Sequence, residues 1–309
     1  MKDKILFVNH KEKSCGVYQY GQRLANILCK EKRYYFNYIE IDNYNNFICE
    51  IQKNNYKHII FNWHQGTVPW LNQNIIEFTK IPVSCIYHDS ATPDHLNMHS
   101  IFMSNMTNDI STKRYALSRP ISFKNTQIQK EKNTINIGSF GFGLPRKRFD
   151  LVCEKVKSEF ENANINFHIT TAKIADVYGH YSSAVIQSCV KAIEGTKIKL
   201  KITTNIISEE ELNDFLQNND INIFMYDNAD SNGLSSVIDH VVGAGCIFAV
   251  NSAHMFSHVI KEFPQLNIDN HCIKDIISLG NAPAKKFQEL WSNEIVKNQI
   301  YEVIYGNNR

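Results

Sequence analysis

The stretch "IGSFGFGLPRKRFD", Ile137 to Asp150, decides the fold, because it joins an apolar run to a helical pattern through glycines and basic residues. The run "TINIGSF" is typical of a buried strand, and "FDLVCEKVKSEF" has the 3–4 spacing of an amphipathic helix. A glycine-containing strand-to-helix connection commonly opens a parallel α/β unit and presents backbone N–H groups to an anion. The stretch predicts an α/β fold and leaves open which anion it holds, or whether it only turns a corner.

The alternation of strand and helix continues along the second half of the chain. A helix over 208–219 is predicted to begin at Ser208 as N-cap, with glutamates in its first turn that complement the helix dipole. A long helical stretch is expected over 174–194, a shorter helix over 235–245, and a final amphipathic helix over 284–304. Further strands are expected at "INFHITTA" (165–172), "KIKLKITTN" (197–205), "INIFMYD" (221–227) and "CIFAVN" (246–251).

The first half follows the same pattern. The predicted helices cover 18–29, 46–54 and 69–79, and Pro69 is expected near the start of the last one. One or two more strands are expected in "HSIFMSN" and "RPISF" (119–123). The main strands are expected at "KILFVNH" (4–10), "FNYIEID" (36–42), "HIIFNW" (58–63) and "PVSCIYHD" (82–89).

Between the halves, the segment "KNTQIQKEKN" (124–133) is polar and has no periodicity, which is typical of a linker. We therefore predict two Rossmann-like doubly wound domains, over 1–125 and 134–285. The C-terminal helix, 286–309, is expected to pack back on the N-terminal domain. Because ligands bind beyond the carboxyl ends of parallel strands, a cleft between two such sheets is the expected site.

Composition excludes some classes of protein. The chain has 309 residues and a formal net charge of +2, whereas bulk nucleic-acid binding needs a clustered basic excess. Its eight cysteines include no CxxC pair, which favours small buried hydrophobes in a reducing compartment over a metal site. The apolar run within the opening "MKDKILFVNH" is too short for a signal peptide, and no run has membrane-spanning length. The expectation is a soluble cytoplasmic protein.

Two nucleotide motifs fail at the opening stretch. A dinucleotide fingerprint needs G-x-G-x-x-G, but Arg146 stands where the third glycine is required after Gly141 and Gly143. The next strand also has no acidic residue at its end to bind ribose hydroxyls. No G-K-[ST] occurs, so a Walker-type loop is excluded as well. A nicotinamide-dependent enzyme is accordingly the weakest interpretation.

What remains is Arg146-Lys147-Arg148 at a helix start, where the helix dipole disfavours cations. An anionic ligand would explain these side chains, and a solvated basic run is the structural alternative.

A second polar segment follows the strand that ends at Asp227. The sequence "DNADSNGLSSVIDH" (227–240) places Asp230 in a loop, two serines at a helix start and Asp239 one turn into the helix. Hydroxyls and N–H groups at a helix start can bind phosphate. The structural alternative is that Ser235 is an N-cap and Asp239 an exposed helix residue.

Three segments together resemble the retaining glycosyltransferases of the GT-B fold, in particular the large bacterial group that builds surface polysaccharides. The segment "ILFVNHKEKSCGVYQYGQRLANIL" is similar to that family's first strand, glycine loop and helix. In "IGSFGFGLPRKRFD", Lys147-Arg148-Phe149-Asp150 takes the place of the family's lysine before G-F-D. The segment 208–250 follows the family order of helix, strand, acidic loop, helix and strand.

The resemblance implies transfer of a sugar from a nucleoside-diphosphate sugar to a saccharide or lipid-linked acceptor, with retention and without a metal or other cofactor. It implies that 1–125 is the acceptor domain and 134–285 the nucleotide-sugar donor domain. Attack occurs on the face that the leaving phosphate vacates, and that phosphate accepts the acceptor's proton. It also implies a cytoplasmic protein, with peripheral contact to the inner face of a membrane if the acceptor is lipid-linked. The resemblance and the loop positions together select catalytic residues His88 and Asp230; donor-binding residues Gly16, Gly141, Arg146, Lys147, Gly233, Ser235, Ser236 and Asp239; and acceptor-binding residues His10 and His64.

The sequence departs from the family pattern at two places. Its acidic pair is Asp230 and Asp239, separated by eight residues, where the family has glutamates separated by seven. Ser139 follows the first glycine of the donor-domain stretch, where the family commonly has arginine, and Arg146 is the candidate substitute. A non-catalytic sugar- or nucleotide-binding module on the same fold is therefore the alternative function.

Overall fold

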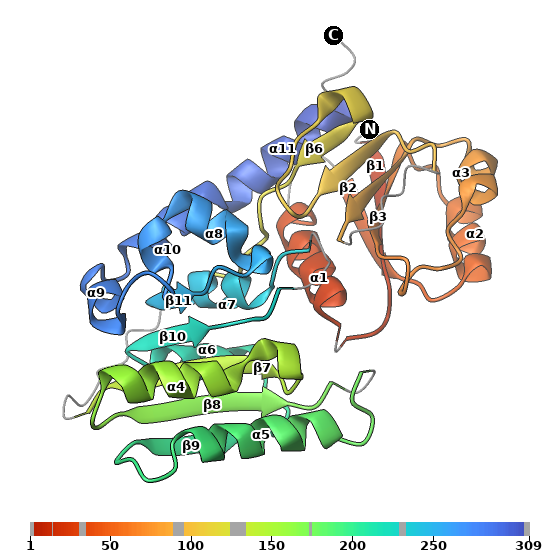
Figure 1. Cartoon of the computed structure of the whole chain (residues 1–309). Helices are drawn as coiled ribbons and strands as arrows, with labels where there is room; N and C mark the ends of the chain where they lie inside the picture. The colour runs from red at the N-terminus through yellow and green to blue at the C-terminus, as the bar shows by residue number, and fades with distance from the viewer. Residues whose placement is uncertain are drawn as a thin grey trace. The chain divides into compact units, whose positions relative to one another are not determined.

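The computed structural model describes residues 3–13, 15–30, 35–88, 96–123, 134–172, 175–228 and 233–305. The chain forms two compact units (Figure 1). The first unit comprises Met1–Ile121, Ser231–Ser236 and Leu290–Arg309, and the second comprises Ser122–Asp230 and Val237–Glu289. The predicted linker, 124–133, lies outside the described residues.

The first unit contains a six-stranded parallel sheet in the order β2-β1-β3-β4-β5-β6. The sheet forms because its strands are short apolar runs: every residue of the central strands β3 and β4 is buried, as expected for strands covered on both faces. Its strands are β1 (Lys4–Asn9), β2 (Tyr35–Glu40), β3 (His58–Trp63), β4 (Val83–Tyr87), β5 (Ser100–Met103) and β6 (Arg114–Ala116).

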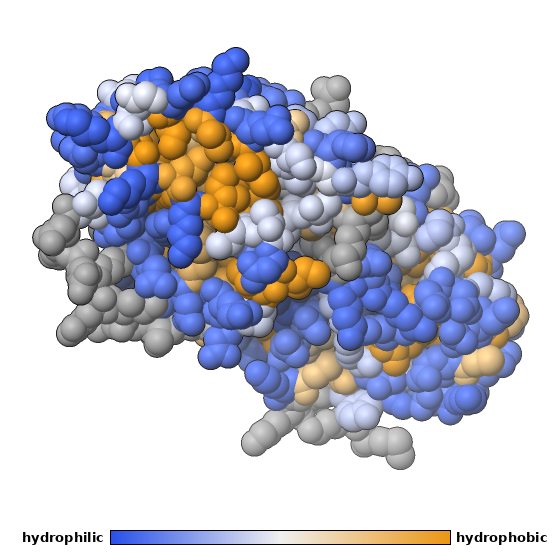
Figure 2. Space-filling model, turned by 90° about the horizontal axis from the view of Figure 1, so that it is seen from below, coloured by the Kyte–Doolittle hydropathy of each residue, from blue (hydrophilic) through white to orange (hydrophobic). Residues whose placement is uncertain are grey.

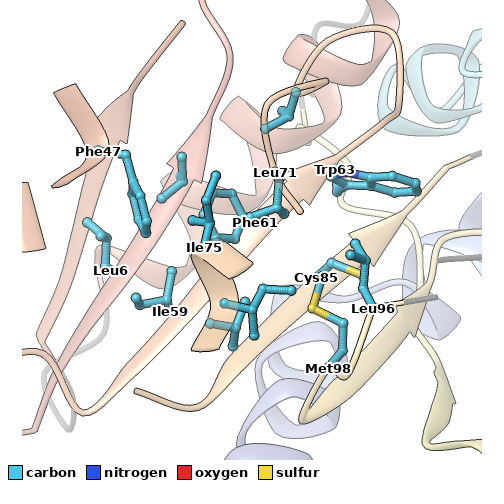
Figure 3. Packing of buried hydrophobic residues seen from close by; sticks show 14 of the residues in the cluster. Leu6, Phe47, Ile59, Phe61, Trp63, Leu71, Ile75, Cys85, Leu96 and Met98 are labelled. Carbon is cyan, nitrogen blue, oxygen red and sulfur yellow. The ribbon is translucent and has the colours of Figure 1, made fainter. Parts of the chain in front are cut away.

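Helices cover both faces of this sheet. On one face, α2 (Tyr44–Lys53) and α3 (Gln73–Thr79) begin at Asn43 and Asn72, whose side chains accept backbone N–H bonds as N-caps. They pack Phe47 and Ile75 against Leu6, Ile59 and Phe61 (Figure 3). The helices α1 (Gly16–Leu28) and α11 (Asn293–Tyr305) cover the other face, where Val296 and Ile300 of α11 join the core.

The second unit has a five-stranded parallel sheet in the order β11-β10-β7-β8-β9. Here α4 packs beside α5 and α6 beside α7. A reciprocal capping box between Ser208 and Glu211 fixes the start of α6, as the sequence predicts. The elements are β7 (Asn136–Phe142), α4 (Phe149–Glu159), β8 (Asn164–Thr170), α5 (His180–Ala192), β9 (Lys199–Thr203), α6 (Glu209–Gln217), β10 (Ile221–Phe224), α7 (Val237–Gly243), β11 (Phe248–Val250), α8 (Ser257–Glu262), α9 (Ile273–Ser278) and α10 (Ala282–Leu290).

Short 3₁₀ helices complete the described chain. They are η1 (Ile110–Thr112), η2 (Pro145–Lys147), η3 (His254–Phe256) and η4 (Pro264–Leu266). No disulfide joins the eight cysteines, all of which the structure describes. The face of the molecule in Figure 2 is largely hydrophilic and carries one large hydrophobic area and several smaller ones. Large exposed hydrophobic side chains of the second unit are Val177, Tyr178, Tyr181, Val190 and Ile206.

Several predicted boundaries are wrong. The helix expected from Pro69 begins at Gln73, because Asn72 caps it. The long helix expected over 174–194 is limited to His180–Ala192. The run 119–123 is not a strand, and the last strand of the first sheet is Arg114–Ala116 instead. The final amphipathic pattern is two helices, α10 and α11, with a break at Trp291-Ser292.

Candidate functional site

The predicted glycine-containing connection is shorter than expected, because the strand before it continues to Phe142. Gly138 and Gly141 lie within β7, so the connection from β7 to η2 is reduced to Gly143-Leu144. Gly141 has φ +148°, a conformation that L side chains rarely adopt. A Cβ at Gly143 would lie 2.7 Å from the Cα of Ser182, at the start of α5. The glycines therefore let the strand end pass close to the neighbouring helix.

The three basic residues of this connection have different environments. The Arg148 guanidinium is paired with the carboxylates of Asp150 at 3.0 Å and Asp227 at 2.9 Å, and these bonds raise its pKa. Arg146 is exposed, and its backbone carbonyl accepts a hydrogen bond from the N–H of Asp227. Arg148 therefore ties the start of α4 to the end of β10, and Lys147 and Arg146 remain the candidates for an external anion.

Lys147 is partly exposed, and its Nζ lies 3.7 Å from the centroid of the Tyr226 ring. Burial, and secondarily the positive charge of Arg146, lower the pKa of Lys147 to about 7. Among the residues that the structure describes, no carboxylate pairs with this ammonium. An aromatic ring supports the ammonium without neutralising it, so a bound anion would strengthen its charged form.

The second polar segment is described in part. Asp230 lies outside the described residues. Gly233 and Ser236 are half-buried, Ser235 is buried, and α7 begins just after Ser236. Asp239 is the third residue of α7, and its exposed fraction is 1%. The alternative that Asp239 is merely an exposed helix residue is therefore wrong.

In the first unit, three predicted histidines follow the carboxyl ends of neighbouring strands. His10 follows β1, His64 follows β3 and His88 follows β4, and the strand order places β1, β3 and β4 side by side. Because all three strands run parallel, the histidines share one edge of the sheet. Gly16, the first residue of α1, lies near Ser236: a Cβ built on it would be 3.6 Å from the Ser236 hydroxyl.

His10 is buried, and its Nδ1 accepts a hydrogen bond from the N–H of Glu12 at 3.2 Å. Its buried Nε2 has no hydrogen-bond partner among the described residues. Burial is the main cause that lowers the pKa of His10, and His64 lowers it further. His64 is half-buried, and its Nδ1 accepts from the N–H of Gly66 at 3.0 Å. The accepting Nδ1 and the lowered pKa of His10 both favour its neutral imidazole.

His88 belongs to an amide network that the sequence analysis missed. Its Nε2 lies 2.7 Å from Oδ1 of Asn62, and its ring packs edge-on against Tyr20 with centroids 4.7 Å apart. The Asn62 side chain in turn contacts Asn9, and both asparagines are fully buried. Asparagine is usually exposed, so the strand endings "FVNH" and "FNWH" carried a signal: polar residues placed inside apolar runs.

A cavity of about 540 Å³ lies elsewhere in the first unit and contains none of the predicted site residues. It is lined by Gln73, Glu77, Leu96, Asn97, Met98, Ile101, Ser111, Thr112 and Lys113. Within the described parts of the chain, no three His, Cys, Asp or Glu side chains are grouped to hold a metal ion. None of the described helices has the length and apolar character needed to cross a bilayer.

No protein-family model and no curated protein sequence matches this chain. Its fold is nevertheless similar to solved structures over nearly its full length. One is HepE from Anabaena in complex with UDP and glucose, with 10% identity, 98% of this chain and 100% of that chain covered, and a TM-score of 0.67. A glycosyltransferase from Rickettsia africae is 14% identical, with 99% of this chain and 97% of that chain covered and a TM-score of 0.63. AviGT4, involved in avilamycin A biosynthesis, is 9% identical, with 97% of this chain and 96% of that chain covered and a TM-score of 0.64.

At these identities the likeness concerns the fold. The fold prediction is confirmed: the chain has two Rossmann-like α/β domains, in the arrangement of strands and helices that glycosyltransferases of the GT-B fold share.

Proposed function

We propose that this protein is a glycosyltransferase that takes a sugar from a nucleoside-diphosphate sugar and transfers it to a saccharide or lipid-linked acceptor with retention. Lys147 carries the proposal: a half-buried ammonium on an aromatic ring, at the carboxyl end of a central strand, with no carboxylate partner among the described residues. Such an ammonium is suited to a phosphate. The fold supports the same class, since HepE is a structural neighbour solved with UDP and glucose and with UDP-glucose.

In this proposal Lys147 and Arg146 neutralise the diphosphate, which stabilises it as the leaving group when the glycosidic bond breaks. Ser235 and Ser236 donate hydrogen bonds to phosphate oxygens, while Gly16, Gly141 and Gly233 allow close backbone approach. Asp239 accepts hydrogen bonds from the ribose hydroxyls, and Asp230 accepts them from the sugar hydroxyls. His88 contacts the donor sugar, and His10 and His64 bind the acceptor.

The reaction forms a bond between the anomeric carbon and the acceptor oxygen, and breaks the bond from that carbon to the phosphate oxygen. Both events occur on one face of the sugar, so the configuration is retained. The acceptor's hydroxyl proton goes to the departing phosphate oxygen. The protein therefore supplies charge and orientation rather than a pair of acid–base carboxylates. The proposed location is cytoplasmic, at the inner face of the membrane when the acceptor is lipid-linked.

The proposal is tested by thermal shift with UDP, GDP and ADP and with their sugar conjugates. UDP or GDP is expected to raise the Tm, and Lys147→Ala is expected to abolish the shift. Lys285→Ala, which removes an exposed lysine of α10 in the same unit, serves as the matched control. Absence of a shift with every nucleoside diphosphate would contradict the proposal.

A non-catalytic binding module is the second candidate, and the shorter acidic residues Asp230 and Asp239 favour it. Sugar-nucleotide hydrolysis and transfer separate the two functions. Binding without either reaction, with a panel of saccharide and lipid-linked acceptors, identifies the module.

A further inference from the structure

The buried asparagines at the ends of β1 and β3 have a defined orientation. Nδ2 of Asn62 lies 2.7 Å from the carbonyl oxygen of Val17 and 2.9 Å from Oδ1 of Asn9. Nδ2 of Asn9 lies 3.1 Å from the carbonyl oxygen of Tyr18. Backbone carbonyl oxygens accept hydrogen bonds and cannot donate them, so each amide must turn its NH₂ group toward α1.

A second constraint agrees with this orientation. The backbone N–H of His10, which can only donate, lies 3.0 Å from Oδ1 of Asn9. The oxygen of Asn9 thus accepts from both His10 and Asn62, and its nitrogen donates toward Tyr18. A flip of either amide would place two donors or two acceptors face to face in a buried site.

The orientation of Asn62 decides the proton position on His88. Oδ1 of Asn62 can only accept, and it lies 2.7 Å from Nε2 of His88. We propose that Asn62 is a positioning residue that holds His88 in the Nε2–H tautomer, so that Nδ1 is the accepting nitrogen of the neutral ring. The bond to Asn62 is the same in the neutral ring and in the imidazolium, because Nε2 carries hydrogen in both.

The same side chains fix α1 against the strand ends. A Cβ added at Gly21 would lie 2.8 Å from the amide carbon of Asn62 and 2.9 Å from Nδ2 of Asn9. The Tyr20 ring packs edge-on against the His88 ring. The Arg119 guanidinium lies 5.0 Å from the centroid of the Tyr20 ring. Asn62 is therefore a shared anchor for the first turn of α1 and for the His88 imidazole.

This inference deepens the proposed function and rests on it only for the role of His88. In the proposed transferase, Asn62 fixes which ring nitrogen of His88 carries hydrogen when the ring is neutral. The tautomer itself is a property of the folded first unit and can be measured without turnover.

The test is a long-range ¹H–¹⁵N correlation spectrum of the imidazole rings in protein labelled with [¹⁵N]histidine. The chain has twelve histidines, and the signal absent from His88→Gln identifies His88. At a pH where this ring is neutral, hydrogen on Nε2 is expected. Hydrogen on Nδ1, or a mixture of the two tautomers, would overturn the proposal.

Asn62→Leu removes the accepting oxygen at similar size, and His88 is then expected to change from Nε2–H alone to a mixture of both tautomers. Asn222→Leu is the matched control, because Asn222 is equally buried in the second unit and accepts from Asn219 there. Retention of pure Nε2–H in Asn62→Leu would refute the role of Asn62. If that variant does not fold, the wild-type spectrum still decides the tautomer.

Turnover of the UDP-, GDP- and ADP-sugars of the thermal-shift panel, assayed in parallel, separates the two proposals. Nε2–H without turnover of any UDP-, GDP- or ADP-sugar, with the same panel of acceptors, contradicts the transferase and leaves the tautomer standing. Turnover with Nδ1–H contradicts the tautomer and leaves the transferase standing.

Discussion

The Lys147 ammonium lies over the Tyr226 ring, with Nζ 3.7 Å from the ring centroid. The two residues come from different strand ends, since Lys147 follows β7 and Tyr226 follows β10. These strands are neighbours in the sheet, so the contact depends on their pairing. It places a cation of lowered pKa, about 7, at the edge where α/β sheets bind ligands.

The first prediction concerns the pH dependence of UDP binding. A bound diphosphate favours the charged lysine, whereas the empty site loses that charge as the pH rises through about 7. The dissociation constant for UDP is therefore expected to rise by up to about tenfold per pH unit above pH 7. Calorimetry at pH 8 in buffers of different ionisation enthalpy should show uptake of nearly one proton. Lys147→Arg, which stays charged, should flatten the dependence; equal affinity at pH 7 and pH 9 in wild type would contradict the assignment.

The second prediction separates Arg148 from its two basic neighbours. Arg148 pairs with Asp150 and Asp227, and its side chain is 30% exposed. Arg148→Ala should lower the free energy of unfolding by about 1 kcal/mol, as expected for a partly solvated bidentate pair. Arg146→Ala, at an exposed position, should leave stability within about 0.5 kcal/mol and weaken UDP binding instead. Urea denaturation and UDP titration of both variants check this prediction. Weaker UDP binding in Arg148→Ala, with lower stability in Arg146→Ala, would show that Arg148 is the anion ligand.

The third prediction concerns the close approach at Gly143. An added Cβ would lie 2.6 Å from Oγ and 2.7 Å from Cα of Ser182. Since a backbone atom cannot move aside cheaply, Gly143→Ala should lower the free energy of unfolding by about 2–3 kcal/mol. At Gly195 a Cβ meets nothing within 4 Å and only the φ of +74° is unfavourable, so Gly195→Ala should cost about 1 kcal/mol. Equal losses in urea denaturation would mean that α5 can shift to accept the methyl group.

The fourth prediction concerns stability in acid. His58 is buried, and its Nε2 lies 2.7 Å from the Ser84 hydroxyl. Burial, and secondarily His99, lower the pKa of His58 from 6.5 to about 3. Between these values the unfolded chain binds a proton that the folded chain does not, so stability falls as the pH falls below 6.5. His58 alone should remove about 1.6 kcal/mol between pH 6.5 and pH 5.

His58→Gln has no titrating ring and keeps a side chain able to hydrogen-bond Ser84. Urea unfolding of wild type and variant at pH 7, 6 and 5 should give a shallower loss for the variant. Parallel curves would contradict the lowered pKa of His58.

The local pattern of the sequence predicted the two α/β units because strand and helix periodicities are properties of consecutive residues. Ser208 and Glu211 form their capping box within four residues of chain, so it was readable in advance. The Pro69 start failed because Asn72 offers the better cap for α3. The strand "TINIGSF" continues through Gly141 to Phe142, and Gly138 packs closely against the distant residues Asn219 and Asn222. The candidate site residues were predicted because they follow the ends of strands. Parallel pairing brings the carboxyl ends of the strands of one sheet to the same edge of that sheet.

By itself, then, the sequence determined which segments are strands and helices, and that polar residues follow the strands. The tertiary structure decided what each polar side chain does. The Asp227 carboxylate pairs with the Arg148 guanidinium, 79 positions away in the chain. The Tyr226 ring contacts the Lys147 ammonium because β7 and β10 are paired. Asn62 reaches both Val17 and His88. These partners are distant in sequence, and a side chain's charge state and orientation follow from the groups around it in space, which no local periodicity records.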